Sequence, residues 1–455
     1  MCWCVRMING RVKRLQRQIR RLKKENENFR EENICLKSEN QALKKKLAEY
    51  EKSSHRVKKI TYKASTTSTQ KRPGRRPGHK GTSRKIPEHI DATVDITLES
   101  CPHCGTLLGT PVEERVRYVE DIEPPKPRVT QYHINRYYCP TCRKNVSIHP
   151  PEVIPHCMLG IKVMLLVVYQ RYALHLPYNK IRDNLEQCFG IKTTDTTLFN
   201  AVKLISSYYR EEFLRIKHQL KENPYVHIDE TGWRINGVNH WLWTFITETA
   251  VIFKIDKRRS SHVPREVLGD EYDGVVISDF YTAYDKLPGK KQKCLVHLLR
   301  ETKKVSGKNA STQRFHRRIK RFIQDAARFV KENPSPAERK SAYKRFYKRL
   351  ERIIEEPYTD PDCLRLVKRL KKHKDSLLTF LEEDVDYHNN TAERALRSSV
   401  VMRKITGGNR SQVGADTHEI LMSMCENSKL HNENFLEESA QFMRTQLKKG
   451  ATSKS

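Results

Sequence analysis

Two aspartates of this 455-residue chain end short apolar runs, an arrangement that allows metal-dependent chemistry if the carboxylates meet. Asp229 ends the run 225–229, and Asp279 ends the run 274–279. Two adjacent carboxylates repel each other and tend to hold a proton between them unless a divalent cation removes that penalty. Such ligands suit Mg²⁺ or Mn²⁺, and two ions about 4 Å apart can stabilise both oxygens of a phosphodiester displacement. The alternative is that each aspartate simply caps a turn.

The segments around these aspartates predict a β-sheet. Strands are expected at 225–229, 241–247, 250–256 and 274–279, with a tight turn at Glu248-Thr249. Three antiparallel strands followed by one that is apolar enough for burial on both faces match the opening of an RNase H-like sheet. The first and fourth strands of that sheet are neighbours, so we expect Asp229 and Asp279 to converge at one edge.

A third acid is expected on a helix packed beside the first strand, and Glu393 is the candidate. Asn390 is a good N-cap, and small helix-forming residues follow it. Glu393 also lies three residues after Asn390, which is the spacing of a capping box, so it can instead bond back to the cap. Four neighbouring acids are alternatives: Glu382, Glu383, Asp384 and Asp386.

Two Cys-x-x-Cys pairs, 34 residues apart, predict a metal site of a different kind. Cys101 with Cys104, and Cys139 with Cys142, can each present two thiolates to one tetrahedral Zn²⁺ ion, at the ends of a β excursion near 131–138. This is the pattern of a zinc ribbon with one structural zinc. Disulfides are the rival reading and are disfavoured in a reducing compartment.

The excess of basic residues is confined to two segments. The chain has 87 Lys and Arg against 54 Asp and Glu, a formal net charge of +33. Residues 1–90 hold 26 basic and 8 acidic residues, residues 303–374 hold 23 and 8, and the rest is neutral overall. Concentrated basic blocks beside neutral sequence indicate a nucleic-acid partner. The alternative is a pair of solvated basic helices.

Residues 8–50 carry a heptad repeat that predicts a parallel homodimeric coiled coil. Successive asparagines at one seam position fix the register and favour two strands. The alternative is a long basic amphipathic helix on nucleic acid or on its own core. One seam comprises Ile8, Leu15, Leu22, Phe29, Leu36, Leu43 and Tyr50, and the other Val12, Ile19, Asn26, Asn33, Asn40 and Leu47.

The segment that follows is rich in Arg, Pro and Gly over 71–80 and resembles an AT-hook. Gly and Pro prevent a helix or strand, and an extended Arg-rich ribbon is thin enough for a minor groove. A plain flexible linker is the alternative. The residues expected to contact DNA here are Arg72, Arg75, Arg76 and Lys80.

Residues 158–220 read as helical. An apolar helix is expected over 158–172, followed by helices at 179–188 and 194–204 joined by a turn at Phe189-Gly190-Ile191. Thr194 or Asp195 can cap the last of these. The pair has the form of a helix-turn-helix that reads DNA, but helix pairs joined at Gly are also common in ordinary cores.

Taken in order along the chain, these motifs resemble transposases of the insertion-sequence sixty-six (IS-sixty-six) family. The resemblance covers nearly the whole sequence, although Leu295 stands where family members often have Trp. Its most specific pieces are 229–233 (DETGW), 278–284 (SDFYTAY), 294–300 (CLVHLLR) and 389–397 (NNTAERALR). It implies a D-D-E nuclease core in which Asp229, Asp279 and Glu393 bind two Mg²⁺ or Mn²⁺ ions.

The resemblance also implies partners. These are double-stranded DNA, as element ends and target, and possibly accessory transposition proteins. The basic insertion after Arg300 would meet DNA near the cut. Cys294 and His297 match a Cys-x-x-His element for which we expect a packing role. A basic, Gly-rich turn after the third acid can hold a phosphate or be a solvated loop. The further expected DNA contacts are Arg397, Arg403, Lys404 and Arg410.

The sequence thus predicts an α/β protein with an RNase H-like catalytic core and a helical insertion, preceded by a coiled coil, a zinc ribbon and a helix-turn-helix-like domain. It is expected to be a cytoplasmic, nucleoid-associated DNA transposase. The longest apolar run, 163–169, is far shorter than the ~20 residues that cross a bilayer, and 1–6 leads into basic helix rather than a secretory signal. The rivals are a structure-selective RNase H-like nuclease and a non-catalytic, zinc-dependent DNA-binding regulator. The expected segments are coiled coil 1–52, linker 53–90, zinc ribbon 91–155, helical region 156–222, core 223–302, insertion 303–380, core 381–445 and tail 446–455.

Overall fold

The computed structural model describes residues 86–122, 125–147, 150, 153–155 and 157–452, with short pieces at 16, 18–27, 30, 37–38 and 41. The chain divides into two units, 1–119 and 120–455, which are treated separately below. The described residues between 16 and 41 are helical and exposed, and the remainder of the predicted coiled-coil seam lies outside the described residues. The linker up to residue 85 also lies outside them.

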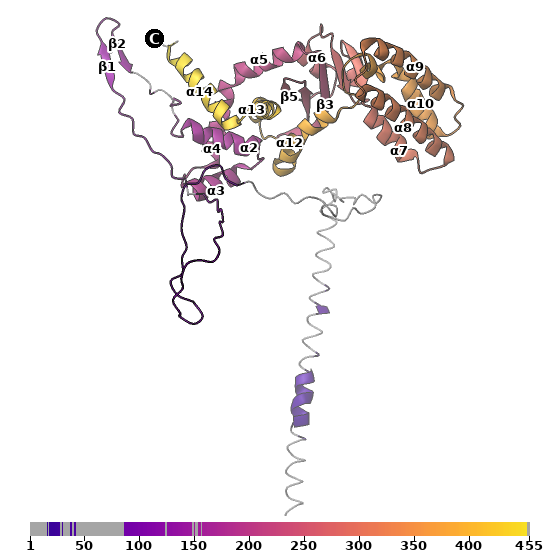
Figure 1. Cartoon of the computed structure of the whole chain (residues 1–455). Helices are drawn as coiled ribbons and strands as arrows, with labels where there is room; N and C mark the ends of the chain where they lie inside the picture. Colours follow the sequence, from indigo (N-terminus) through magenta and orange to yellow (C-terminus); the bar gives the residue numbers. More distant parts are fainter. Residues whose placement is uncertain are drawn as a thin grey trace, which may run out of the picture. The chain divides into compact units, whose positions relative to one another are not determined.

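A five-stranded sheet forms the centre of the second unit (Figure 1). Its strand order is β5-β4-β3-β6-β7; β3, β4 and β5 are antiparallel, and β6 runs parallel to both β3 and β7. The predicted neighbourhood of the first and fourth strands is therefore confirmed, whereas β7 was not predicted because its residues are polar. The strands are β3 (Tyr225–Ile235), β4 (Val238–Ile246), β5 (Val251–Asp256), β6 (Val275–Ser278) and β7 (Lys290–Lys293).

Strand β3 is longer than the sequence predicted. The expected strand ended at Asp229, but β3 continues to Ile235 because β4 pairs with it along its whole second half. The hairpin closes at Asn236 and Gly237, whose φ angles of 48° and 76° suit the turn that matches strand twist. The parallel ladder with β6 covers only 225–227 of β3. Asp229 thus lies within β3, just past the point where that ladder stops.

Helix α13 (Gln412–Leu430) closes the free edge of β5 with its side chains. The outward N–H groups of Val251, Phe253 and Ile255 donate to side chains four residues apart on the helix, at 2.7–3.0 Å. These acceptors are Asn427 Oδ1, Ser423 Oγ and Glu419 Oε1. An open strand edge is a template for unwanted pairing, so this ladder both satisfies buried amides and blocks association.

Asn427→Ala is expected to lower the free energy of unfolding by about 1–3 kcal/mol, because both the N–H and the C=O of Val251 lose their partner in a buried site. Denaturant unfolding at neutral pH measures this difference. The exposed amide Gln441, on α14 (Phe435–Thr452), provides the control, since its replacement by Ala should change stability by less than about 0.5 kcal/mol. Equal effects of the two substitutions would contradict this account of the edge.

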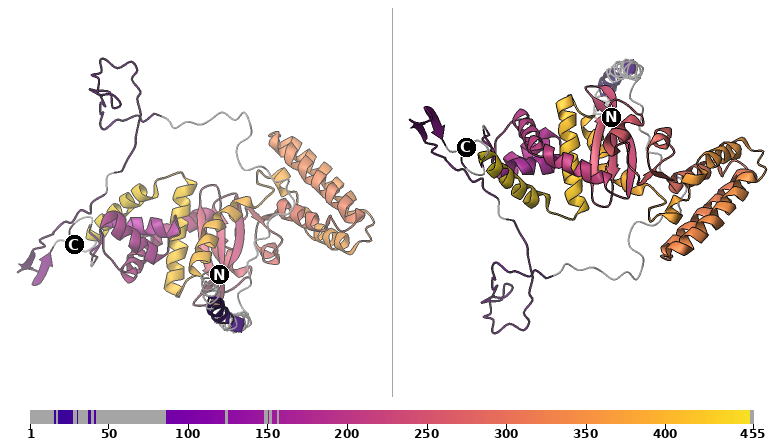
Figure 2. Two further views of the ribbon diagram at one scale, coloured as in Figure 1. Left: turned by 90° about the horizontal axis from the view of Figure 1, so that it is seen from below. Right: turned by 90° about the horizontal axis from the view of Figure 1, so that it is seen from above.

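Two groups of helices lie on opposite sides of the sheet (Figures 1 and 2). Helices α2 to α5, with α13 and α14, share one hydrophobic core with the sheet, whereas α7 to α10 have a core of their own. The first group comprises α2 (Ile161–Tyr172), α3 (Tyr178–Phe189), α4 (Asp195–Tyr208) and α5 (Arg210–Lys221). The second comprises α7 (Leu295–Val305), α8 (Ala310–Lys331), α9 (Pro336–Glu355) and α10 (Pro361–Lys372). The predicted basic insertion is thus helical.

Helices α3 and α4 form the predicted helix pair. Gly190, with a φ of 65°, ends α3, and the Thr194 side chain caps α4 by accepting from Thr197 N at 3.2 Å. The preceding helix, expected from Met158, begins at Ile161. The apolar residues that join α3 and α4 belong to the main core, so the pair has a packing role whatever else it does. Among the described residues, no helix combines the length and apolar character needed to cross a bilayer.

Candidate active site

The register of β3 and β6 brings Asp229 and Asp279 to adjacent positions. His227 pairs with Ile277, and the same register extended by two residues places Asp229 opposite Asp279. Asp279 directly follows the last residue of β6, and its Oδ1 accepts from Tyr281 N at 2.8 Å. Asp229 Oδ1 accepts from Glu230 N at 3.0 Å. The convergence that the sequence predicted for the two aspartates therefore matches the strand pairing.

The electrostatics of Asp229 indicate a concentration of negative charge around it. The pKa of Asp229 is raised to about 8, chiefly by burial and then by the negative charges of Glu230, Asp279 and Glu393, against a hydrogen bond from Glu230 N that lowers it. The charges of the other two predicted acids, Asp279 and Glu393, thus both act on Asp229. This is the environment in which a bound cation relieves repulsion.

This raised pKa predicts how stability depends on pH. An unfolded aspartate has a pKa of about 3.9, so between about pH 4 and 8 the unfolded chain releases a proton that folded Asp229 retains. The stabilising effect of that proton is therefore complete below about pH 4 and is lost as pH rises to about 8. Asp229→Asn mimics the protonated form, so its stability relative to the natural protein should rise with pH, by at most about 1.4 kcal/mol per pH unit.

Denaturant unfolding of both proteins from pH 5 to 9, in buffers without added divalent cations, measures this difference. A difference that does not vary with pH would contradict the prediction.

Glu230, next to Asp229, is held by hydrogen bonds from Arg259 and Tyr284. Arg259 donates to Glu230 Oε1 through Nε at 3.0 Å and Nη2 at 2.8 Å, and the Tyr284 hydroxyl donates to the other oxygen. The Arg259 guanidinium lies over the rings of Trp241 and Tyr281, with its carbon 4.2 and 4.3 Å from their centroids. Both Glu230 oxygens are engaged, which leaves Asp229 as the available acid of this pair.

Asn389 joins the helix of the third acid to strand β3. It is fully buried; its Nδ2 donates to Ile228 O at 2.8 Å, and its Oδ1 lies 3.1 Å from His227 Nδ1. Its backbone N–H donates to Cys294 Sγ at 3.2 Å. Helix α12 (Asn390–Thr406) begins directly afterwards. One side chain therefore ties the start of α12 to the residue that precedes Asp229.

Glu393 lies in the first turn of α12 and pairs with α7. Its Oε1 lies 3.0 Å from Arg300 Nη1 and 3.5 Å from His297 Nε2, and its Oε2 accepts from Arg300 Nη2 at 3.4 Å. The expectation that Asn390 is the N-cap was wrong: the helix is preceded by Asn389, whose side chain makes no capping hydrogen bond because it serves β3. Glu393 does not bond back to a cap, so the capping-box alternative is not realised.

The alternative third acids are occupied elsewhere or exposed. Glu383 pairs with Lys290, Asp384 with Arg339, and Asp386 lies 3.7 Å from His227 Nε2. Glu382 is exposed at the end of α11 (Thr379–Glu382). Of the five acids considered for the third position, Glu393 is the one whose charge raises the pKa of Asp229.

Cys294 and His297 flank this site without forming one of their own. Cys294 is buried, which raises the pKa of its thiol, and its sulfur accepts the Asn389 N–H. His297 contacts Glu393 through Nε2. The expected packing role agrees with these contacts.

The carboxylate oxygens around Asp229 are of the type that binds a hard divalent cation, but the three acids do not lie as close together as metal ligands do. Across the described residues, no three His, Cys, Asp or Glu side chains are close enough to hold a metal ion. Glu393 is turned to Arg300, which supplies the positive charge beside it. The fit rests on two carboxylates at adjacent strand positions and on the raised pKa of Asp229.

The basic residues predicted to contact DNA after the third acid differ in their exposure to solvent. Arg397, Lys404 and Arg410 are exposed. Arg403 points inward instead: its Nη1 donates to Gly232 O and lies 3.1 Å from Thr231 Oγ1, so it ties α12 to β3. The four basic residues predicted at 72–80 lie outside the described residues.

The Gly-rich turn after α12 is bound to the β3–β4 hairpin. The N–H groups of Gly407, Gly408 and Asn409 donate to Arg403 O, Thr406 Oγ1 and Arg234 O, so these three amides are not free to hold a phosphate as predicted. Gly408 has a φ of 118°, and a Cβ there would lie 2.4 Å from Arg234 O. Close packing against the hairpin, rather than anion binding, explains this glycine.

Each Cys-x-x-Cys pair lies in a tight turn. Ser100 and Leu107 form a bridge around Cys101 and Cys104, in the first unit. Strands β1 (Arg136–Cys139) and β2 (Lys144–Ser147) flank Cys139 and Cys142, in the second, so the strand expected over 131–138 begins only at 136. In each turn, the residue after the second cysteine has a positive φ, 73° at Gly105 and 51° at Arg143. The two turns thus share one backbone form.

Hydrogen bonds in these turns favour thiolates. Thr106 lowers the pKa of Cys104, mainly through its side chain, and the Cys142 N–H, 3.5 Å from Cys139 Sγ, lowers the pKa of Cys139. The thiolate is the form that binds a metal.

Comparison with known proteins defines the class. A model described as the IS66 transposase family matches residues 156–417, more than half of the chain. A second, described as the zinc-finger binding domain of IS66 transposases, matches residues 99–143 and spans all four cysteines. The chain therefore belongs to the IS66 family of transposases, as its motifs had indicated.

A curated relative has been named without a function. The chain is 33% identical over 138 residues to an uncharacterized protein, y4jO, of Sinorhizobium fredii. The matched stretch is 30% of this chain and 39% of the relative, so the chain spans well under half of that protein's length.

Three residues that shape the site were not recognised from sequence. Arg300 and Asn389 lie inside the quoted motifs, but nothing in their spacing marks them as the partners of Glu393 and Ile228. Arg259 had no local signal, since it contacts Glu230 from 29 residues away. Only the fold brings these partners together.

Proposed function

We propose that this protein is a D-D-E transposase that cleaves DNA at element ends and joins the ends to target DNA. The proposal is supported chiefly by one observation: the parallel register of β3 and β6, extended by two residues, sets Asp229 opposite Asp279, and the charge of Glu393 acts on Asp229. We also propose that the sheet is RNase H-like, since three antiparallel strands are followed by a fourth that runs parallel to the first. Family membership supports the same reaction class.

The three acids would hold two Mg²⁺ or Mn²⁺ ions. Bound there, such ions would activate the attacking oxygen and stabilise the charge on the leaving oxygen. The protein's own part is positioning. The Tyr281 N–H orients the Asp279 carboxylate, Asn389 holds the start of α12 against β3, and Arg300 holds the Glu393 carboxylate.

We propose that Cys101, Cys104, Cys139 and Cys142 together bind one structural Zn²⁺. The matching turns, the lowered thiol pKa values and the match to a zinc-finger model support this site. Metal analysis of the purified protein should find about one zinc per chain, and Cys139→Ser should lose it, whereas Cys188→Ser, at an exposed cysteine on α3, should retain it. Stoichiometric zinc in Cys139→Ser would exclude the four-cysteine site.

The proposed partners are double-stranded DNA, a second copy of the chain joined through the predicted coiled coil of 1–52, and accessory transposition proteins. The coiled coil is a proposal from the heptad pattern. Light scattering of the full chain and of a variant lacking 1–50 tests it: the variant should have half the mass, and an unchanged mass would refute the dimer.

A joining assay separates the reaction from its rivals. The protein is incubated with Mg²⁺ or Mn²⁺, duplexes carrying pre-cut element ends, and a target plasmid. A transposase gives covalently joined products, whereas a structure-selective nuclease gives hydrolysis alone. A DNA-binding regulator gives neither, and for a regulator Asp229→Ala would leave all biological activity intact.

A further inference from the structure

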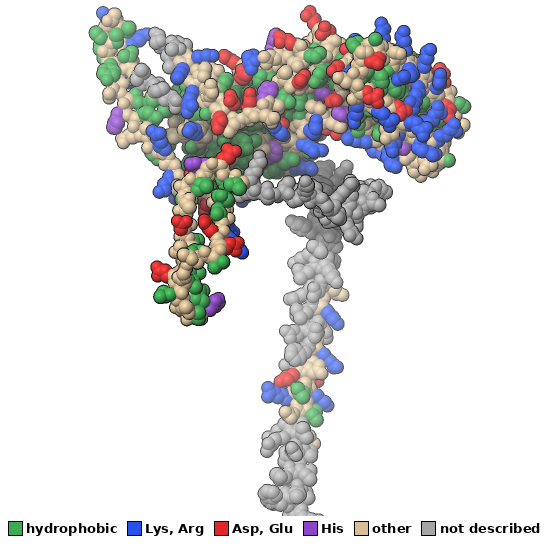
Figure 3. Space-filling model, viewed as in Figure 1, with side chains coloured by type: hydrophobic (Ala, Val, Ile, Leu, Met, Phe, Trp, Pro, Cys, Tyr) green, Lys and Arg blue, Asp and Glu red, His purple; other side chains and the backbone are tan. Residues whose placement is uncertain are grey.

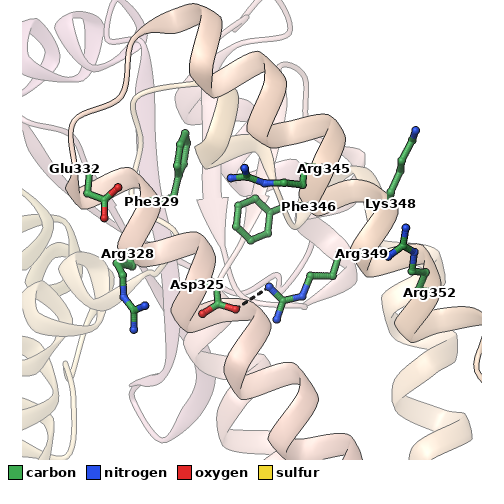
Figure 4. Close-up of a pocket in the computed structure, with 9 residues that line it drawn as sticks. All are labelled: Asp325, Arg328, Phe329, Glu332, Arg345, Phe346, Lys348, Arg349 and Arg352. Atoms are coloured by element: carbon green, nitrogen blue, oxygen red, sulfur yellow. Dashed lines mark hydrogen bonds and ion pairs between the residues drawn. The ribbon is translucent and has the colours of Figure 1, made fainter.

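Helices α8 and α9 form a long groove lined mostly by basic side chains. Two cavities, of about 520 and 560 Å³, lie between these helices and adjoin at Arg349 and Arg352, which line both. We call it the α8–α9 groove. Its charged lining residues are Arg314, Arg317, Arg318, Arg321, Asp325, Arg328, Glu332, Arg345, Lys348, Arg349 and Arg352. Figure 4 shows one half of the groove, and Lys and Arg side chains also gather on this part of the surface in Figure 3.

Charged residues, all basic except Asp325, recur at helical spacing, so that each helix turns one charged stripe to the groove. On α8, the lining residues 314, 317, 321, 325 and 328 are three or four apart, and on α9 so are 345, 348 and 352. At a rise of about 1.5 Å per residue, the α8 stripe is about 21 Å long. Arg349 crosses the groove to Asp325, with Nη1 2.7 Å from Oδ2.

Only part of this charge is neutralised within the protein. Arg314 and Arg318 pair with Glu356, and Arg345 lies over the Phe346 ring, 5.3 Å from its centroid. Within the described residues, no ion pair is found for four exposed arginines of the groove: Arg317, Arg321, Arg328 and Arg352. Like charges concentrated in this way repel one another, and an anionic partner would relieve the repulsion.

The shape and chemistry of the groove favour duplex DNA as that partner. One strand of a duplex carries a phosphate about every 3.4 Å along the axis, so a stripe of about 21 Å matches about six phosphates. An acidic protein helix would also need an apolar surface for its side chains to pack against. The aromatic residues of the groove are Phe329 and Phe346, and the Arg345 guanidinium lies over both rings. We therefore propose that the α8–α9 groove binds the phosphate backbone of duplex DNA. The proposal deepens the proposed function, since it concerns the same substrate, but it does not depend on the three acids.

The groove stands on a rigid base. Helices α7 to α10 have their own hydrophobic core, in which Phe315, Ile319 and Phe322 of α8 are buried opposite the groove-lining arginines. The Gln292 side chain of β7 donates to Leu377 O at 3.3 Å and accepts from Phe380 N at 2.8 Å, which joins this core to the sheet. Surface arginines of the groove can therefore be replaced without disturbing the acids.

Salt-dependent binding of the full chain to duplex DNA tests the groove. In the groove variant, Arg317, Arg321 and Arg352 are each replaced by Ala. In the matched control variant, three exposed lysines that do not line the groove are each replaced by Ala: Lys320, Lys340 and Lys368. Each lost phosphate contact lowers the slope of log affinity against log salt by about 0.9. The groove variant should lose about three units of slope, equally for different DNA sequences, and the control less than one.

A measurement on the natural protein keeps the proposal testable if the groove variant folds poorly. Duplex DNA should protect Arg317, Arg321 and Arg352 from phenylglyoxal, as mapped by mass spectrometry, and an acidic polypeptide should not. The proposal would be overturned if the groove variant kept the salt slope of the natural protein, or if the control variant lost as much slope as the groove variant. It would also be overturned if duplex DNA left the three arginines unprotected, or if the acidic polypeptide alone protected them. If the protein joins DNA but the groove variant has the salt slope of the natural protein, the groove proposal is rejected and the proposed function stands. If binding depends on the groove but no DNA is joined, the groove proposal stands and the proposed function is rejected.

Discussion

Asp279→Asn is expected to reduce the joining of element ends to target DNA by about a thousandfold or more, while binding to the same ends is retained. The substitution removes one of two carboxylates at adjacent strand positions, and with it the charge that would hold a divalent cation there. Stabilisation of the reacting oxygens by such ions is worth several kcal/mol, and each 1.36 kcal/mol is tenfold in rate. Asp229→Asn should behave alike, because the two residues share one site.

Asp273→Asn is the matched control for this loss of charge. Asp273 is exposed and lies before β6, at the opposite end of the strand from Asp279. It should join DNA as the natural protein does. Gel assays of joined products, with binding measured in parallel, compare the three variants. Joining by Asp279→Asn at a rate near that of Asp273→Asn would reject the assignment of Asp279 and the reaction proposed for this site.

Asn389→Ala is expected to lower the free energy of unfolding by about 3 kcal/mol and to impair joining. The substitution leaves Ile228 O and His227 Nδ1 without their side-chain partner in a fully buried place, and each such loss costs about 1–3 kcal/mol. It also releases the start of α12 from the strand that carries Asp229, so Glu393 should lose its fixed position relative to that acid. Joining should therefore fall more than DNA binding.

The neighbouring asparagine gives a control of the same chemistry. Asn390 is only half-buried, and its replacement by Ala should change stability by less than about 0.5 kcal/mol. Denaturant unfolding and the joining assay, applied to both variants, distinguish the two positions. Equal stability of the two variants would show that the Asn389 bridge contributes little to the junction of α12 and β3.

Local pattern was enough to locate four of the five strands. Apolar runs bounded by turns marked these strands, because burial of side chains dictates such runs. The fifth strand, β7, was missed because its residues are Lys, Lys, Gln and Lys, and its pairing with β6 is decided by the backbone. The same reason explains why β3 was cut short at Asp229: the residues beyond it look polar, yet β4 pairs with them.

The sequence by itself determined the family of this protein: its basic blocks, its cysteine pairs and four ordered motifs sufficed to recognise the resemblance to the IS66 family, which the family model confirms. These signals are local, since charge, metal-ligand spacing and apolar periodicity are written in neighbouring residues. The tertiary structure decided which groups meet. Arg259 reaches Glu230, Asn389 reaches Ile228, and Arg403 turns inward to Gly232 instead of outward to solvent. Such pairings depend on strand register and helix packing between segments far apart in the chain, which no local pattern encodes.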